Sequence, residues 1–307
     1  MSPVRRGVKR DVSAIAQRVA DQLFRDSQIE PLVCGEFSRQ EFEFALATSA
    51  SPVWVDDSSG HVRGHLYGAH FDDPVHGRQT WSGPDGYSYE FESVLDNLCE
   101  WAFRTWRENG SNAHLVWALA GNGTQAWIER GYRIVSVRGA TALNVPFEFT
   151  WPEGHSLRRA NPSDLQTALS FDALIDMAQG VQLDALTDEQ RRAIQDDIVE
   201  LLEDPDSKYY LLDVDGRPVA QCVTFALPPL RGNFDHTVYV GSLAVDPSFR
   251  RRGIATMLLH AVLNDAINDG FQFAEVRWHI ENEQATSLWS ALGFHPTYVQ
   301  LRRPLND

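Results

Sequence analysis

The stretch of this chain best equipped for chemistry holds three arginines in a row, Arg250, Arg251 and Arg252. Two small residues follow them, Gly253 and Ala255. Guanidinium groups donate paired hydrogen bonds to phosphate oxygens, and a glycine lets an anion come close to the backbone. These residues predict a site for a pyrophosphate or a similar polyanion, although a surface turn with three solvated arginines would leave the same pattern.

The elements on either side of this turn would position the anion. Residues 238–245 are rich in β-branched and apolar side chains and predict a strand, which ends at Asp246-Pro247 because proline cannot donate to a ladder. Apolar residues at helical spacing from Ile254 predict a helix that Asp269-Gly270 closes. The first N–H groups of such a helix lack partners within it, and the helix dipole adds positive charge there.

Two motifs of the chain resemble a known family. The pattern R-x-x-G-x-A at 250–255 is similar to the acetyl-CoA signature R/Q-x-x-G-x-G/A of the GNAT acetyltransferase superfamily, and the text LAVDP at 243–247 also looks like that family. Residues 282–294, NEQATSLWSALGF, resemble its N-x-x-A-x-x-L-Y-x-x-L-G-F segment. The matching positions are Asn282, Ala285, Leu288, Leu292, Gly293 and Phe294. The resemblance predicts a GNAT fold for the C-terminal half.

Length and composition bound the class of protein. The chain has 307 residues, 43% of them hydrophobic, which is enough for one large or two ordinary domains with a sizeable core. No apolar run is long enough to predict a membrane span, and no apolar segment follows the basic N-terminus as a signal peptide would require. Cys34, Cys99 and Cys222 show neither metal-ligand spacing nor a disulfide pattern. We expect a cytoplasmic protein without a bound metal.

The chain contains an internal repeat. Arg5 and Asp11 recur as Arg158 and Asp164 at the same spacing, and a helix-capping box recurs as well. Asp11 is the expected N-cap of the helix that follows it. The capping boxes lie at 38–41 and 187–190. The offset between the copies stays near roughly 150 to 160 residues, which indicates two copies of one domain. Both copies follow the order helix, helix, hairpin, strand, helix, strand, helix, strand.

This repeat predicts the architecture. We expect an α/β (α+β) protein of two tandem GNAT-like domains, residues 1–146 and 147–307, each with a mixed, mostly antiparallel central sheet flanked by helices. The layout resembles mycothiol synthase and related tandem GNAT proteins, also in the texts at 152–164 and 300–305. The acidic and histidine-containing acceptor segment of that group is not seen within 172–184, so mycothiol is not the expected substrate.

Only the second copy carries the predicted anion-binding turn. The corresponding residues of the first copy, 81–92, contain no arginine, and Asp85, Glu90 and Glu92 among them would repel a pyrophosphate. Residues 72–86 are polar and rich in glycine and proline, so a loop or an irregular strand is expected. The first copy is therefore predicted to be a degenerate domain that does not bind the cofactor. It would give shape to the second copy or line the acceptor pocket.

The resemblance implies which residues bind acetyl-CoA as the co-substrate of a direct acetyl transfer to an amine. Pantetheine would lie along the backbone of Leu243, Ala244 and Val245, and an N–H of Val245 or Leu243 would polarise the thioester carbonyl. The three arginines and the start of the helix would bind the pyrophosphate. The N–H groups involved are those of Gly253, Ile254, Ala255 and Thr256. Asn282 would bond the pantetheine arm, cap its own helix, or do both.

The sequence leaves the acid and the base of the reaction open. Where the family often has a tyrosine that protonates the leaving thiolate, this chain has Trp289, whose indole donates a hydrogen bond but cannot act as an acid. Where the family often has a glutamate on the cofactor strand, this chain has Tyr239, a side chain with a reference pKa of about 10. By pKa, His236 and His279 are better bases. Tyr239, His279 and Glu281 are the predicted catalytic candidates.

The predicted reaction is acetylation of an amine on a small molecule. A peptide or protein amine is an alternative acceptor, and a CoA-binding sensor or scaffold without turnover is an alternative of another class. Aminoacyl transfer from charged tRNA fits the duplication but fits the acidic charge and the intact turn poorly. The formal net charge of −15 argues against nucleic-acid and membrane partners. A homodimer is left open.

Overall fold

The computed structural model describes residues 4–33, 37–49, 51–57, 60–73, 76–178, 181–226 and 236–305, so Cys34 lies outside the described residues. These residues form two compact units, one of 4–138 with 296–305 and one of 139–226 with 236–295. The predicted fold class is confirmed, since each unit packs helices on mixed, mostly antiparallel strands. The predicted division at residues 146 and 147 stays a prediction. The compact units differ from it in the last strand of the chain, which lies with the first unit.

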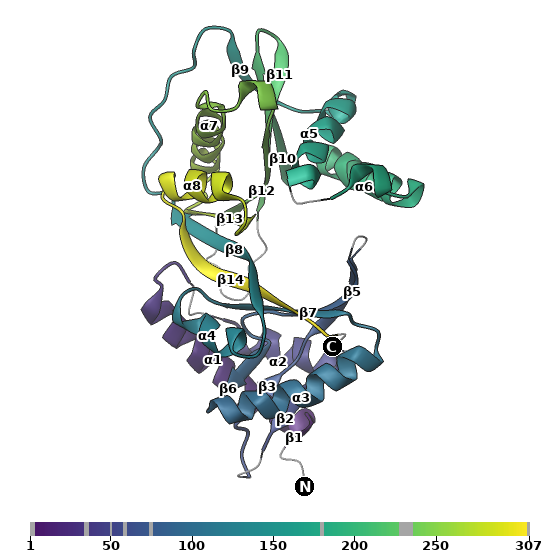
Figure 1. The fold of residues 1–307 in the computed structure, drawn as a ribbon. Helices are drawn as coiled ribbons and strands as arrows, with labels where there is room; N and C mark the ends of the chain where they lie inside the picture. The colour runs from purple at the N-terminus through teal and green to yellow at the C-terminus, as the bar shows by residue number, and fades with distance from the viewer. Residues whose placement is uncertain are drawn as a thin grey trace. The chain divides into compact units, whose positions relative to one another are not determined.

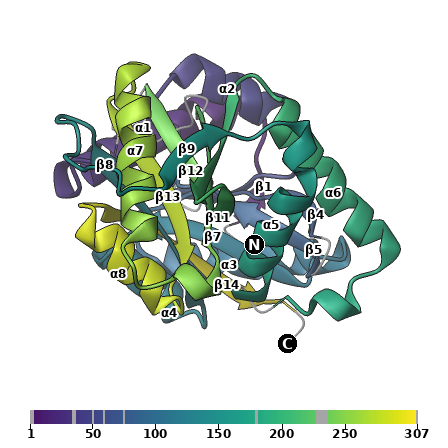
Figure 2. The same cartoon turned by 90° about the horizontal axis from the view of Figure 1, so that it is seen from above.

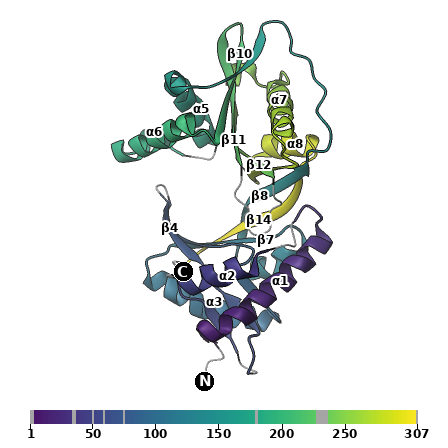
Figure 3. The ribbon, with the colours of Figure 1, turned by 180° about the vertical axis from the view of Figure 1, so that it is seen from behind.

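The first unit has helices on both sides of its strands. Its strands are β1 (Val4–Arg6), β2 (Trp54–Asp56), β3 (Gly64–Leu66), β4 (Ala69–Asp73), β5 (Gly77–Ser82), β6 (Tyr87–Tyr89), β7 (Ala113–Leu119), the start of β8 (Arg133–Ala142) and most of β14 (His295–Pro304). Its helices are α1 (Val12–Ile29), α2 (Arg39–Thr48), α3 (Glu92–Glu108) and the short α4 (Gln125–Ile128). The strand orders are β1-β2-β3-β6 and β4-β5-β7-β14-β8. Figure 1 shows α3 in front of these strands, and Figure 3, which views the molecule from behind, shows α1 and α2 on their opposite side.

The second unit is built around one sheet with the strand order β13-β12-β11-β10-β9. Its strands are β9 (His155–Arg159), β10 (Ser207–Val214), β11 (Arg217–Ala226), β12 (Thr237–Val245) and β13 (Phe273–His279). Its helices are α5 (Leu165–Ala178), α6 (Asp188–Glu203), α7 (Ile254–Asn268) and α8 (Glu283–Ala291). All neighbours in this sheet are antiparallel except β12 and β13, which are parallel. Helices α5 and α6 cover one face and α7 covers the other (Figure 1), and the view from above separates the same layers (Figure 2).

One arrangement of charges recurs in both units and confirms the repeat. In the first unit, Arg5 donates from Nη1 and Nη2 to both carboxylate oxygens of Asp11, at 2.7 and 2.9 Å, and from Nε to Asp57 at 2.5 Å. In the second unit, Arg158 donates to both oxygens of Asp164, at 2.9 Å each, and from Nε to Asp213 at 2.8 Å. Each guanidinium thus ties the first strand of its unit to the start of the first helix and to the end of a neighbouring strand.

This arrangement corrects the expected role of Asp11. The sequence predicts that Asp11 caps α1, but its side chain makes no capping bond to that helix. The carboxylate instead accepts from Arg5 and from the backbone N–H of Val8, at 2.8 Å. The paired guanidinium is a stronger donor than a single backbone N–H, so the carboxylate turns toward it. The capping box predicted at Thr187 is confirmed, because Thr187 and Gln190 bond one another's backbone N–H groups.

A second correction concerns residues 72–86, where a loop or an irregular strand was expected. The structure has a regular strand there, β5, which pairs in parallel with β7. Its inward-facing side chains are polar, which hides the strand from a hydrophobic pattern. Thr80 and Ser82 are buried, and their hydroxyls bond Ser111 and His114, each at 2.8 Å. Burial of these polar groups is tolerated because each has a partner.

The charge arrangement around Arg158 predicts a stability change. We expect Arg158→Gln to lower the free energy of unfolding by about 1–3 kcal/mol, because Asp164 and Asp213 would then lie close together without a cation. Their side chains are only 12% and 11% exposed. Urea unfolding of the full chain measures the change. Arg159→Gln is the matched control, since the neighbouring arginine is exposed and has no carboxylate partner among the described residues. Equal losses in both variants would contradict the account.

Candidate functional site: a strand, a turn and a helix start

The second half of β12 has a neighbouring strand on one side only. Its antiparallel pairing with β11 continues to Val245. Its parallel pairing with β13 runs from Thr237 to Val240 and, within the described chain, stops there. The register shifts at the same place, since Val240 and Ser242 pair with consecutive residues of β11 and Gly241 is skipped. This half of β12 therefore leaves one edge of its backbone available to a ligand.

The three residues predicted to bind pantetheine, Leu243, Ala244 and Val245, lie on this half-paired part of β12. Successive side chains of a strand point to opposite faces. Ala244 packs in one cluster with Ala168 and Phe171 of α5, so the side chains of its two neighbours point to the face that α7 covers. We call these two faces of the sheet the α5 face and the α7 face.

The turn after β12 ends in a glycine whose backbone has the left-handed conformation. Gly253 has a φ of 77° and directly precedes α7, and a Cβ built on it would meet no atom within 4 Å. The first hydrogen bond of α7 runs from the N–H of Met257 to the carbonyl of Gly253, at 2.9 Å. The N–H groups of the three residues between them have no acceptor within the described chain. These residues are Ile254, Ala255 and Thr256. The open space over Gly253 and the three free donors together form a cradle for an anion.

The three arginines of the turn add positive charge without a carboxylate partner. Arg250, Arg251 and Arg252 are exposed, and none forms an ion pair with any described residue. The Nε of Arg250 donates to the carbonyl of Val245 at 3.1 Å, and the guanidinium of Arg252 lies 5.2 Å from the centre of the Phe249 ring. Arg251 has a φ of 60°, a left-handed conformation that costs a non-glycine residue about 1 kcal/mol. Strain of this kind is most often retained where the residue has a function.

The structure gives Asn282 and Trp289 local structural roles. The Oδ1 of Asn282 accepts from the N–H of Ala285 at 3.0 Å, so this side chain caps α8. Trp289 is 4% exposed, and its ring packs on Phe294 with centroids 5.1 Å apart and an interplanar angle of 70°. The first unit has the same pair, Trp127 on Tyr132, at 5.1 Å and 72°. Trp289 therefore belongs to a ring pair that both units contain.

The predicted catalytic residues do not form one cluster. Tyr239 lies on the paired part of β12, opposite Glu275 of β13, with its ring centroid 5.1 Å from that of Phe225. His279 follows Glu275 by four residues, which is about 13 Å along an extended strand. Glu281 is exposed in the turn that follows β13. The structure thus separates Tyr239 from His279 and Glu281, and all three stay predictions as catalytic groups.

Two carboxylic acids that the sequence reasoning did not single out lie on or near the α5 face. Glu275 is 6% exposed and stands opposite Tyr239 in the parallel register. Asp172 is half-buried on α5, next to Phe171, and forms no hydrogen bond or ion pair with any described residue. A charged residue within the apolar strand text FAEV and another within the apolar helix text LSFDALI are the signals that point to them.

The surroundings of Asp172 favour its neutral form and leave it receptive to a cation. Burial, together with the charges of Asp176 and Asp197, raises the pKa of Asp172 to about 6. The charge of Asp172 in turn contributes to the raised pKa of Tyr209, so the two groups are close. The buried hydroxyl of Tyr209 donates to Gln221, which pairs with Ala244 across the sheet. Asp172 thereby lies near the hydrogen-bonded pair of Tyr209 and Gln221, and Gln221 is the neighbour of Ala244 on β12.

The first unit differs from the second in the turn that precedes its helix α3 and in the side chain that corresponds to Leu243. Only Glu90 and Phe91 separate β6 from α3, where the second unit has the eight residues from 246 to 253 between β12 and α7. The ring of Tyr87, at the start of β6, meets the ring of Trp127 edge-on at 5.0 Å and 88°. Leu243 occupies the position in β12 that corresponds to Tyr87, because the strand registers counted from the residues after Arg158 and Arg5 lead to these two residues. A leucine is too short to make this ring contact.

Comparisons with known proteins agree with the geometry. The profile of the acetyltransferase (GNAT) family matches residues 171–294. A GCN5-related N-acetyltransferase from Sphaerobacter thermophilus is 19% identical, with 99% of this chain and 96% of that one covered and a TM-score of 0.64. A tandem GNAT protein from the clavulanic acid biosynthesis pathway is 14% identical, with 99% and 98% covered and a TM-score of 0.59. No curated protein matches the chain.

Residues 171–294 of the second unit thus match the profile of the acetyltransferase (GNAT) family, and the whole chain has the fold of a tandem GNAT protein. No described helix is long and apolar enough to cross a membrane. No group of three or more metal-ligating side chains occurs in the part of the chain that the structure describes.

The contrast between Tyr87 and Leu243 predicts that a tyrosine at position 243 would block the candidate site. We expect Leu243→Tyr to weaken binding of acetyl-CoA by at least about tenfold, because a ring here would extend toward Trp289 as Tyr87 extends toward Trp127. The melting temperature should change by no more than about 2–4 °C, since the first unit already accommodates this ring pair. Calorimetric titration of acetyl-CoA measures the affinity. Leu243→Met, which nearly conserves volume, should bind like the parent, and equal binding by the tyrosine variant would refute the correspondence.

Proposed function

We propose that this protein is an acetyl-CoA-dependent N-acetyltransferase that acetylates an amine on a small molecule. The observation that carries the proposal is the turn between β12 and α7. Counting only the described residues, it combines three arginines without carboxylate partners, three N–H groups without acceptors and an open approach over Gly253. In a chain with a formal net charge of −15, such a local excess of donors and positive charge fits a pyrophosphate.

The half-paired edge of β12 supports the placement of the reacting thioester. A pyrophosphate held at the start of α7 would direct the pantetheine arm along Leu243, Ala244 and Val245, whose backbone has a free edge. A backbone N–H of this edge, from Leu243 or Val245, would donate to the thioester carbonyl as negative charge develops on its oxygen. Fixing both ends of the acyl donor in this way supplies orientation, which accounts for much of the catalysis of such transfers.

The transfer itself is a direct attack of the amine nitrogen on the thioester carbon. The C–N bond forms, the C–S bond breaks, and the thiolate of CoA leaves. Because Trp289 is buried against Phe294, it does not protonate that thiolate. A thiol is acidic enough to leave as its anion, so turnover does not require a protein acid at this place. The proton of the amine, in contrast, needs a base.

Asp172 is the residue best suited to receive the acceptor. It is a half-buried carboxyl group on α5 with no hydrogen-bond or ion-pair partner among the described residues, and α5 packs against Ala244 of β12. An acceptor that approaches from the α5 face would bring its ammonium group to Asp172, with Tyr209 and Gln221 as polar neighbours. A carboxyl group with a pKa of about 6 is ionised at neutral pH and can take a proton from an amine. We therefore favour a small cationic amine as the acceptor.

The proposal predicts release of CoA thiol that depends on both the amine and Asp172. We expect the full chain to release thiol from acetyl-CoA with at least one member of a panel of monoamines, diamines and polyamines. The rate should fall as the pH decreases through about 6, because Asp172 becomes protonated there. Asp172→Asn should bind acetyl-CoA normally, lower kcat/KM by at least about tenfold and lose this acidic limb.

Two controls separate the possible outcomes of this experiment. Asp197→Asn removes a like charge near Asp172, so its acidic limb should persist and move to lower pH. Arg252→Glu combined with Gly253→Asp should abolish binding of acetyl-CoA and therefore all thiol release. Binding of acetyl-CoA without release for any amine would make the protein a CoA sensor. Release only with a peptide bearing a free N-terminal amine would move the acceptor to that class, and absence of binding would refute the proposal.

A further inference from the structure

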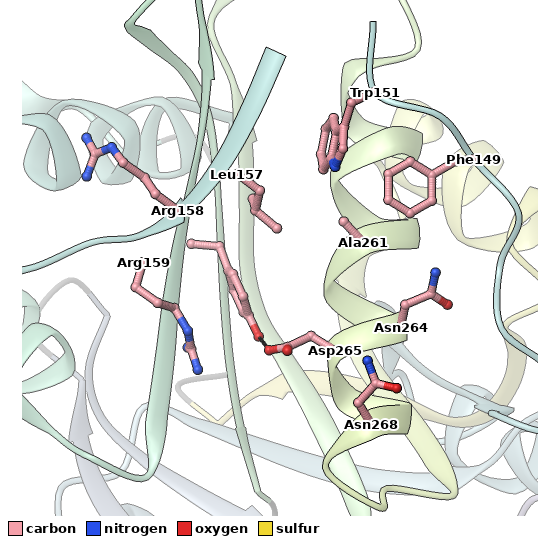
Figure 4. Close-up of a pocket in the computed structure, with 10 residues that line it drawn as sticks. Phe149, Trp151, Leu157, Arg158, Arg159, Ala261, Asn264, Asp265 and Asn268 are labelled. Atoms are coloured by element: carbon pink, nitrogen blue, oxygen red, sulfur yellow. Dashed lines mark hydrogen bonds between the residues drawn. The ribbon is translucent and has the colours of Figure 1, made fainter.

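A hollow of about 400 Å³ lies beside the last two turns of α7, at the end of the helix opposite to the anion-binding turn. Four parts of the second unit line it: the segment before β9, β9 itself, β10 and α7. In Figure 4, Leu157 and Arg159 lie on the strand side, and Trp151, Phe149 and Ala261 lie on the helix side. Its volume is within the range of small-molecule sites.

Several polar groups around this hollow already have partners. Asn264 bonds the backbone of Phe147 from both ends of its amide, at 2.7 and 2.8 Å. Asp265 accepts from Tyr210 and from Lys208. Arg158 is held by its two aspartates. These groups shape the hollow but have little capacity left to recognise a ligand.

Three polar groups at the hollow have no hydrogen-bond or ion-pair partner among the described residues. The guanidinium of Arg159 is exposed and lies over the ring of Tyr210, with 4.4 Å from Cζ to the ring centroid. The amide of Asn268 and the indole N–H of Trp151 also make no hydrogen bond within the described part of the chain. Arg159 is therefore the one charged group of the lining whose charge is not paired by contact with another described residue.

The remaining lining is flat and apolar. The ring of Trp151 and the side chain of Leu157 are partly exposed and offer faces on which a planar ring can stack. A guanidinium prefers a carboxylate, which it binds through two parallel hydrogen bonds. Apolar faces next to one cation that no described carboxylate pairs favour a ligand with a planar apolar ring and a carboxylate.

We propose that this hollow binds a flat aromatic carboxylate. The ring lies between Trp151 on one side and Leu157 on the other, and the carboxylate bonds Arg159. Asn268 donates a further hydrogen bond at the same end. The site lies on a different part of the second unit from the anion-binding turn, so it binds its ligand independently of acetyl-CoA and of the proposed acetyl transfer.

The experiment compares 2-naphthoate with 2-naphthamide, a neutral ligand of nearly the same shape, in calorimetric titrations of the full chain. We expect 2-naphthoate to bind at least about tenfold more tightly than the amide. Arg159→Gln should remove this difference and leave binding of the amide unchanged. Trp151→Ala should weaken both ligands, because it removes the stacking face.

The matched control is Arg192→Gln, which removes an exposed arginine on α6 outside the hollow and should leave both affinities unchanged. Titration of acetyl-CoA into Arg159→Gln shows that this variant is folded and that its other site is intact, whatever the result for naphthoate. No binding of 2-naphthoate at millimolar concentration would overturn the proposal. Binding that Arg159→Gln leaves unchanged would overturn it as well.

Discussion

The half-paired backbone of β12 is the constraint on which the rest of the second unit depends. A buried strand normally has its N–H and C=O groups paired on both edges, since an unpaired polar group costs free energy. β12 meets this rule only up to Val240. Beyond the residue skipped at Gly241, its second edge lacks a strand partner on β13 and can pair with a ligand. The turn at Gly253 then places the free N–H groups of α7 at the end of the same strand.

The two units show which parts of this design are structural and which belong to the site. Both contain an arginine held by two aspartates, and both contain a tryptophan packed on the aromatic residue that follows a left-handed glycine. These shared features build the fold. The turn of eight residues and the leucine at position 243 occur only in the second unit. The first unit instead has two residues at that turn and the ring of Tyr87 against Trp127. One fold thus supports a half-paired strand edge in one copy and packed rings in the other.

The sequence predicted the strand, the turn and the helix start of the candidate site because their signals are local. A glycine after three arginines, a proline after an apolar strand and a helical stripe all act through neighbouring residues. The strand β5 was not recognised as regular because Thr80 and Ser82 face inward and find partners far along the chain. Asp172 and Glu275 were missed for a related reason, since their significance comes from packing of α5 and β13 against β12. The Asp11 side chain likewise bonds Arg5 rather than the backbone of α1, a choice between two nearby partners that the sequence pattern does not show.

The central claim is that one copy of the fold, and only one, binds acetyl-CoA, along β12 and the start of α7 that follows it. Amide hydrogen exchange of the full chain with and without acetyl-CoA tests it most directly. The account predicts slower exchange in residues 243–256, where free backbone groups would gain acceptors or donors, and unchanged exchange in residues 87–92 of the first unit. Equal protection of both segments, or protection of neither, would contradict it.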